Sequence, residues 1–125
     1  MGYSFDNNTP IYLQIIDFIK QQIISKRYKP NQKIPSVREF AMMFEVNPNT
    51  VQKALQELED MRLIQTESTN GKFITTNVDL ISQISNQTIS EEIEKFYKCM
   101  EKLGLSKEQV NNIINQKEWL WIFCK

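Results

Sequence analysis

The sequence contains no histidine, and its only two cysteines, Cys99 and Cys124, lie far apart. The absence of histidine removes the commonest general base and the commonest metal ligand. Two distant cysteines form neither a CxxC pair nor a zinc-binding set, and we interpret them as free, buried thiols in a reducing cytoplasm. The sequence also has no Gly-rich phosphate loop and no pair of carboxylates in a recognisable pocket. We therefore expect no enzyme activity, no metal and no cofactor.

Long apolar runs and net charge are missing as well. No apolar stretch approaches roughly 18 residues, which predicts that no segment spans a membrane. The first ten residues, MGYSFDNNTP, lack the basic and apolar regions of an export signal, so we expect a cytoplasmic protein. The 15 Lys and Arg residues balance the 15 Asp and Glu residues, but a neutral total can contain a local charged patch. With 125 residues, 41% of them hydrophobic, the chain is long enough for one globular domain or a small domain with an appendage.

Apolar residues at spacings of three and four predict three helices in the first half of the chain. The first runs from Pro10 to about Ser25, with Thr9 as its N-cap. The second is about two turns long and opens with the capping box Ser36–Glu39. The third begins at Asn47–Pro48, an N-cap followed by proline at the first helical position. Two short helices around a tight turn are typical of a helix-turn-helix.

A hairpin is predicted after the third helix, where the apolar period changes. Leu63–Glu67 and Lys72–Thr76 resemble strands around the turn Ser68–Gly71, and Asn-Gly is a strong hairpin signal. A further short strand is expected at Lys33–Ile34, in the loop before the second helix. A helix-turn-helix followed by a hairpin is a winged helix.

The helical period returns from Val78 onward. Five apolar residues recur at spacings of three and four and predict a narrow seam suited to pairing with another helix, namely Ile89, Ile93, Phe96, Met100 and Leu103. Gly104 ends this helix, and Ser106–Gln109 forms a capping box for a last one. That last helix is lined by Val110, Ile113, Ile114 and Trp121. We thus expect a mainly α fold with a small β-hairpin, made of a winged helix-turn-helix domain over residues 1–77 and a two-helix dimerisation region over residues 78–125.

Local charge is uneven despite the neutral total. Between positions 26 and 53, six basic residues outnumber Glu39 and Glu45 and give a local charge of +4; they are Lys26, Arg27, Lys29, Lys33, Arg38 and Lys53. From Glu57 to Glu67, four acidic residues and Arg62 give −3. The basic segment coincides with the predicted helix-turn-helix, where phosphate contacts would be needed, although an ordinary solvated surface is the alternative.

Three stretches resemble the GntR family of bacterial transcription regulators. They are Lys33–Ala41 (KIPSVREFA), Val46–Leu55 (VNPNTVQKAL) and the wing Leu63–Ile74, and the resemblance covers residues of about 10 to 76. Only about 48 residues follow the wing, which resembles the short YtrA-type branch, whose C-terminal helices mainly make the dimer. The resemblance implies a homodimeric, sequence-specific repressor that binds double-stranded DNA. Members often control a neighbouring operon, commonly one for an ABC transporter.

The resemblance also implies DNA contacts at matching positions. Arg38 matches an arginine that grips the DNA backbone. The turn and recognition-helix positions that face the major groove are matched by Asn47, Asn49, Thr50 and Gln52. Asn70 and Gly71 match the wing tip that enters the minor groove, and Ser36 and Lys53 complete the predicted DNA-binding set. Pro48, Gln52 and Asn70 stand where many members have basic residues or, at the wing, histidine, so the operator sequence does not carry over.

The chemistry of these side chains supports DNA contact independently of the resemblance, but it also allows roles within the protein itself. Asn and Gln can bond bidentately to adenine, which is worth roughly 1–3 kcal/mol of discrimination, and the N-terminus of a helix favours a phosphate. In the alternative, each side chain serves only the protein. Asn47 would be an N-cap, Thr50 would bond its own helix end, Arg38 would pair with Glu39 or Glu45, and Asn70–Gly71 would be no more than a turn.

Two alternatives concern function. A winged-helix protein-interaction module without DNA binding is the alternative to a repressor, and the local charge of +4 argues against it. An aromatic cluster near the C-terminus would serve core packing or dimer contact, or else a small apolar or amphipathic effector; it comprises Phe96, Tyr97, Trp119, Trp121 and Phe123.

Overall fold

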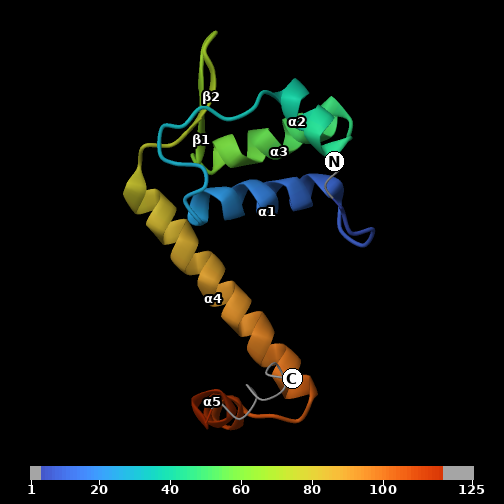
Figure 1. Cartoon of the computed structure of the whole chain (residues 1–125), viewed down its shortest axis with the longest axis vertical. Helices are drawn as coiled ribbons and strands as arrows, with labels where there is room; N and C mark the ends of the chain where they lie inside the picture. The colour runs from blue at the N-terminus through green and yellow to red at the C-terminus, as the bar shows by residue number, and fades with distance from the viewer. Residues whose placement is uncertain (1–3, 117–125) are drawn as a thin grey trace, which may run out of the picture. The chain divides into compact units, whose positions relative to one another are not determined.

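The computed structural model describes residues 4–116, which form two compact units, one up to Ile84 and one from Ser85. In chain order the elements are α1 (Ile11–Ile24), α2 (Val37–Phe44), α3 (Pro48–Asp60), β1 (Ile64–Glu67), β2 (Gly71–Ile74), α4 (Val78–Lys102) and α5 (Lys107–Gln116) (Figure 1). The mainly α fold with one small hairpin is therefore confirmed.

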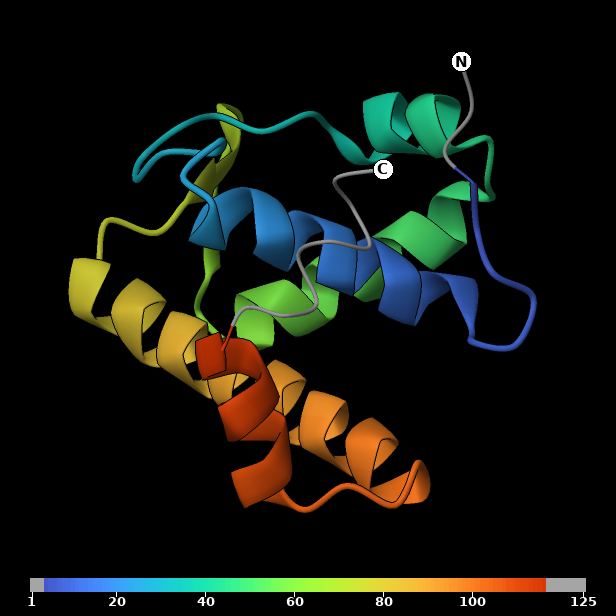
Figure 2. The ribbon, with the colours of Figure 1, turned by 60° about the horizontal axis from the view of Figure 1, so that its bottom comes forward.

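The first unit is built around α3, which packs against α1, α2 and β1. Both views of the ribbon show α1 beside α3 (Figures 1 and 2). The core contains the apolar residues that recur at helical spacing, among them Ile15 and Ile19 of α1, Phe40 of α2, and Val51, Leu55 and Leu58 of α3, all of them fully buried. The first turns of α4 also pack against this core, through Leu80, Ile81 and Ile84. The compact unit therefore extends seven residues beyond Asn77, where the sequence placed the domain boundary.

The N-termini of α2 and α3 have the caps that the sequence predicts. The Glu39 N–H donates to Ser36 Oγ at 3.1 Å, and the Ser36 N–H donates to the Glu39 carboxylate at 2.9 Å. Asn47 caps α3, where its Oδ1 accepts from the Asn49 N–H at 2.8 Å. These bonds satisfy N–H groups that have no partner inside a helix, and they fix where each helix begins.

The start of α1 differs from the prediction, which had Thr9 as N-cap and Pro10 as the first helical residue. Pro10 has an extended backbone, with ψ of 138°, and it occupies the N-cap position itself. Thr9 contributes its carbonyl oxygen, which accepts from Gln14 Nε2 at 2.9 Å, and the same amide nitrogen donates to the Asp6 carbonyl at 2.8 Å. The Gln14 side chain therefore folds the preceding segment back onto the helix, and no hydroxyl cap is formed there.

The hairpin has the predicted strands, shifted slightly at their ends. β1 and β2 are antiparallel, with Ile64 opposite Ile74 and Glu67 opposite Gly71. Leu63 does not join β1, because its N–H donates to the Leu58 carbonyl and closes the end of α3. The turn is closed by the Asn70 N–H, which donates to the Glu67 carbonyl at 2.7 Å. The short strand expected at Lys33–Ile34 is present as a single antiparallel bridge between Lys33 and Phe73.

In the second unit, α4 ends at Lys102 in a left-handed turn at Gly104, whose φ is +84°. Ser106 and Gln109 form the predicted capping box, and the last described helix, α5, follows it. Tyr97 on α4 donates its hydroxyl to Asn111 Oδ1 on α5 at 2.6 Å. The Cys99 thiol on α4 is free but exposed, so the expected burial is wrong for this residue. Cys124, Trp119, Trp121 and Phe123 lie outside the described residues. Over residues 4–116, no helix has the length and apolarity needed to cross a membrane.

Candidate nucleic-acid interface

One face of α3 is buried and the other is open. The buried face consists of residues spaced three and four positions apart, all of them fully buried: Val51, Ala54, Leu55 and Leu58. Asn49, Gln52 and Lys53 lie on the exposed face. The side chains of Asn49 and Gln52 make no hydrogen bond within residues 4–116, so their amide groups are available to a ligand. The N-terminal turn of α3 therefore presents polar groups that the fold does not use.

The hydrogen bonds of Asn47 and Thr50 decide whether these side chains serve the end of α3, as the sequence alternative supposed. The Asn47 side-chain oxygen is committed to capping α3, so the N-cap interpretation is confirmed. Its amide nitrogen has no protein partner in the described part of the chain. The Thr50 N–H donates to the Asn47 carbonyl at 3.0 Å, whereas the Thr50 hydroxyl forms no hydrogen bond to its own helix end.

Arg38 is exposed on α2 and forms no ion pair with Glu39 or Glu45. Glu39 is engaged in the capping box, and the hydrogen bond from the Ser36 N–H lowers the pKa of its carboxyl below the ordinary value. Glu45 occupies the left-handed turn between α2 and α3, with φ of 56°. The guanidinium of Arg38 is thus left for an external anion, while Ser36 is occupied as a cap.

Lys53 has a neighbour that the sequence analysis missed. Its ammonium lies 3.9 Å from the centre of the Tyr12 ring, which is close enough for a cation–π contact. Tyr12 lies in the first turn of α1 and is half-buried. No sequence signal connects positions 12 and 53, because they meet only when α1 packs against α3.

The wing tip is a turn that is also exposed. Asn70 is exposed, and Gly71 has φ of +104°, a conformation that L side chains rarely adopt. A Cβ at Gly71 would also lie 3.0 Å from Cε of Lys33. The positive φ is what favours glycine here, whereas the end of the exposed Lys33 side chain can shift to admit a Cβ.

A polar cluster that the sequence analysis also missed connects α3 to the hairpin. The Glu59 carboxylate accepts from the Thr66 hydroxyl and from the Lys72 ammonium, and Lys72 donates to Thr66 Oγ1 at 2.9 Å. Partial burial raises the pKa of the Glu59 carboxyl, but the hydrogen bonds from Lys72 and Thr66 outweigh it, and the net pKa is lowered. Glu59 is therefore charged at neutral pH and holds both strands.

The basic residues between positions 26 and 53 form no ion pair within residues 4–116. The ion pairs in the described part of the chain are Lys72–Glu59, Lys95–Glu92 and Lys107–Glu94. They include none of the six basic residues between positions 26 and 53, so none of these charges is paired with a carboxylate of the described chain.

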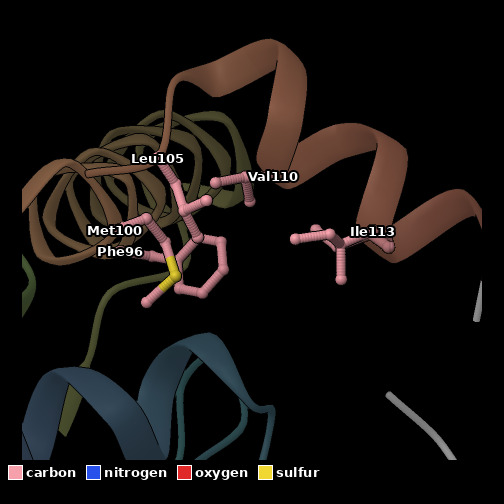
Figure 3. A pocket seen from close by; sticks show the side chains of 6 residues that line it. Phe96, Met100, Leu105, Val110 and Ile113 are labelled. Atoms are coloured by element: carbon pink, nitrogen blue, oxygen red, sulfur yellow. The ribbon is translucent and has the colours of Figure 1, made fainter. Parts of the chain in front are cut away.

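The second unit carries an apolar surface. Most of the predicted seam is exposed in the single chain, with Ile89 at 50%, Ile93 at 49%, Phe96 at 43% and Leu103 at 72%. Phe96 and Met100 also line a pocket of about 310 Å³ whose other walls are Leu105 and the α5 residues Val110, Ile113 and Ile114 (Figure 3). The chain by itself leaves this surface uncovered among its described residues.

Known proteins share this architecture over most of its length. The HTH-type transcriptional regulator YhcF of Bacillus subtilis is 37% identical over 110 residues, which cover 88% of this chain and 91% of that protein. The HTH-type transcriptional repressor YtrA of the same organism is 34% identical over 88% of this chain and 85% of its own. The solved structure of a GntR family transcriptional regulator from Listeria monocytogenes is 38% identical, with a TM-score of 0.82 over 90% of this chain and 98% of that one.

The first unit is also similar to a domain solved with DNA. The AraR DNA-binding domain in complex with operator ORR3 is 29% identical, with a TM-score of 0.52 over 60% of this chain and 88% of that one. The model of bacterial regulatory proteins of the gntR family matches residues 11–74, from the start of α1 to the end of β2. Together with the short relatives that match nearly end to end, this match shows that the chain belongs to the GntR family of bacterial regulatory proteins.

Proposed function

We propose that this chain is a dimeric, sequence-specific DNA-binding repressor that acts on an inverted-repeat operator and controls an operon. The observation that carries the proposal is that Arg38 on α2 and Lys53 on α3 are exposed and form no ion pair within residues 4–116, while the polar side chains of Asn49 and Gln52 are exposed on the same α3 helix. A protein that binds DNA needs cations for phosphates and short polar groups for base edges, and this surface offers both. The operator complex of the similar AraR domain supports the same use of the fold.

The exposed side chains divide by their chemistry. Arg38 carries a permanent charge without a protein partner and suits a phosphate. Asn49 and Gln52 are uncharged and exposed, and they lie about one helical turn apart on α3. They therefore suit base edges in the major groove. Asn70 and Gly71 form the exposed turn at the tip of the wing, which suits the minor groove. We assign Asn47 a secondary role, because its oxygen is used as a cap.

The apolar surface of the second unit supports a dimer. Its exposed isoleucines and Phe96 continue into the open pocket between α4 and α5, and a second copy of the chain would cover both. A two-fold symmetric protein recognises a two-fold symmetric site. We therefore expect half-sites whose centres are about one helical turn, roughly 34 Å, apart.

Selection from a pool of random double-stranded oligonucleotides tests the proposal and identifies the operator sequence at the same time. The chain is expected to enrich an inverted repeat, and binding to the enriched duplex should weaken as salt is raised. Footprinting on that duplex should show protection of both half-sites. If no sequence is enriched and the chain does not bind random DNA at low salt, the winged helix is an interaction module for proteins instead.

A further inference from the structure

We propose that Glu59 is a positioning residue that fixes the wing at the angle needed to reach DNA. The inference rests on the proposed DNA-binding function, but Glu59 itself is not placed at the DNA. It acts through Thr66 and Lys72, one residue from each strand of the hairpin. The cluster therefore connects the helix that reads the major groove with the element that reaches the minor groove.

The three side chains form a closed set of bonds. Thr66 donates to Glu59, Lys72 donates to Glu59, and Lys72 also donates to Thr66. The side chains of Lys72 and Glu59 are only 16% and 23% exposed, so water competes less with this ion pair than with the open pair Lys95–Glu92, at 71% and 66%. Shielding strengthens a charged hydrogen bond relative to a fully solvated one.

The cluster of Glu59, Thr66 and Lys72 lies close to the turn of the hairpin, so it can fix the orientation of the wing tip. Thr66 and Lys72 are directly opposite each other, and the next pair, Glu67 and Gly71, already borders the turn. An isolated two-stranded hairpin is marginally stable in water, so its orientation depends on its attachments. Those nearer its base include the bridge at Lys33–Phe73 and the bond from the Thr75 N–H to the Leu63 carbonyl. Glu59 holds Thr66 and Lys72, one pair before the turn, where the Ile34 N–H also donates to the Lys72 carbonyl at 3.0 Å.

If Glu59 positions the wing, its removal should weaken operator binding, whereas electrostatic repulsion alone predicts that its removal strengthens binding. Glu59 is an acidic residue on a DNA-binding domain, and the removal of an acid near DNA ordinarily strengthens binding because its repulsion of phosphates disappears. Removal of Glu59 also releases the wing and leaves Lys72 without its partner. We expect the loss of wing orientation to prevail on the operator, where the tip has a defined contact to make.

The experiment compares Glu59→Ala with Glu57→Ala, a matched control on the same helix whose side chain makes no hydrogen bond in the described part of the chain. A third variant, Thr66→Val, keeps the shape and the charge and removes only the bridging hydroxyl. Fluorescence anisotropy with the enriched inverted-repeat duplex and with random duplex measures the affinities. Hydrogen exchange of the hairpin amides in the DNA-free protein measures the wing directly.

Glu59→Ala should bind the inverted repeat about three- to tenfold more weakly and random duplex no more weakly than the wild type, while Glu57→Ala keeps or gains affinity on both. Thr66→Val should lose operator affinity in the same direction. Hairpin amides in β1 and β2 should exchange about tenfold faster in both cluster variants, with helical amides unchanged.

Several results would overturn the assignment. They are operator binding by Glu59→Ala at wild-type strength or better, an equal loss on both duplexes, and unchanged hairpin exchange. Failure of the wild type to bind any duplex would count against the proposed function, whereas the exchange measurement still tests the wing.

Discussion

Arg38 and Gln52 are both exposed and both lack a partner in the described part of the chain, yet only one of them is charged. A charge attracts every phosphate regardless of sequence, whereas a carboxamide gains only where a base edge offers matching donors and acceptors. We therefore expect Arg38 to contribute to affinity for any DNA and Gln52 to contribute to specificity for the operator. This difference can be measured at single residues.

Arg38→Ala should weaken binding to the operator and to unrelated DNA alike, because its contribution is the binding of a phosphate. The slope of log K against log salt should also flatten, by about one unit for each phosphate that is no longer bound and so about two units in a dimer. Anisotropy titrations on both DNAs at three salt concentrations provide the slopes. Intact affinity for random DNA in this variant would remove Arg38 from the phosphate-binding surface.

Gln52→Ala should act on the operator alone. Gln52 is exposed and lies outside the buried stripe of α3 that contains Val51 and Leu55, so its truncation leaves the core intact. We expect a loss of roughly 1–3 kcal/mol per half-site on the operator, with random DNA nearly unaffected and the salt slope preserved. The same titrations test this, and Arg38→Ala is the comparison. An equal loss on both DNAs would mean that Gln52 does not read a base.

The residue contacts that sequence reasoning identified are those between near neighbours. The Ser36–Glu39 box and the Asn47 cap follow from side chains two or three positions from their partners. Tyr12 and Lys53 are 41 positions apart, and Glu59 and Lys72 are 13 positions apart. Such pairs depend on how α1 and the hairpin pack against α3, and a single sequence contains no local pattern that indicates them.

At the scale of elements, three helices end in a left-handed residue that is not glycine. Lys26 follows α1 with φ of 67°, Glu45 follows α2 with φ of 56°, and Arg62 follows α3 with φ of 65°. Glycine is the usual residue there because a Cβ makes this conformation unfavourable. The chain has three glycines in total, and Gly71 and Gly104 serve the hairpin and the end of α4. The other helix ends therefore hold backbone strain.

Glu45→Gly should stabilise the protein. Relief of the left-handed strain is worth about 1–2 kcal/mol, and the added freedom of the unfolded chain offsets about 0.5–1 kcal/mol of it. We expect a net rise of about 0.5–1 kcal/mol in the free energy of unfolding, measured by urea denaturation. Glu45→Ala is the matched control, because it removes the same charge but keeps a Cβ. A similar gain in the alanine variant would attribute the effect to charge rather than to the backbone.

Strand ends were the least accurate part of the prediction for the elements. The alternation of apolar residues extends to Leu63 and Thr76, but the backbone of Leu63 is used in closing α3. A periodic pattern reports which face a residue presents and does not show which N–H groups another element has already engaged. The starts of the five helices, several of which have capping signals in the sequence, were located within one residue.

At the scale of the whole molecule, the two ends of α4 belong to different units. Leu80, Ile81 and Ile84 at its start complete the core of the first unit, whereas the exposed seam belongs to the second. The sequence placed the boundary where the wing ends and the helical period returns. It did not show how many turns of the new helix the first core requires, because that depends on the surface that α1 and β1 leave open.

The division of α4 separates the residues that complete the first core from those expected to form the dimer. A chain truncated after Ile84 keeps the residues that cover the first core and loses the whole apolar surface of Ile89, Ile93, Phe96 and Leu103. It should be a folded monomer in analytical ultracentrifugation, whereas the full chain should be a dimer. The full chain with Ile89→Ser and Ile93→Ser should shift toward monomer without loss of helical content, since both side chains are about half exposed. Binding to an inverted repeat should weaken in both variants because two half-sites are then occupied independently. A dimer that persists at micromolar concentration in the truncated chain would place the subunit contact in the winged helix instead.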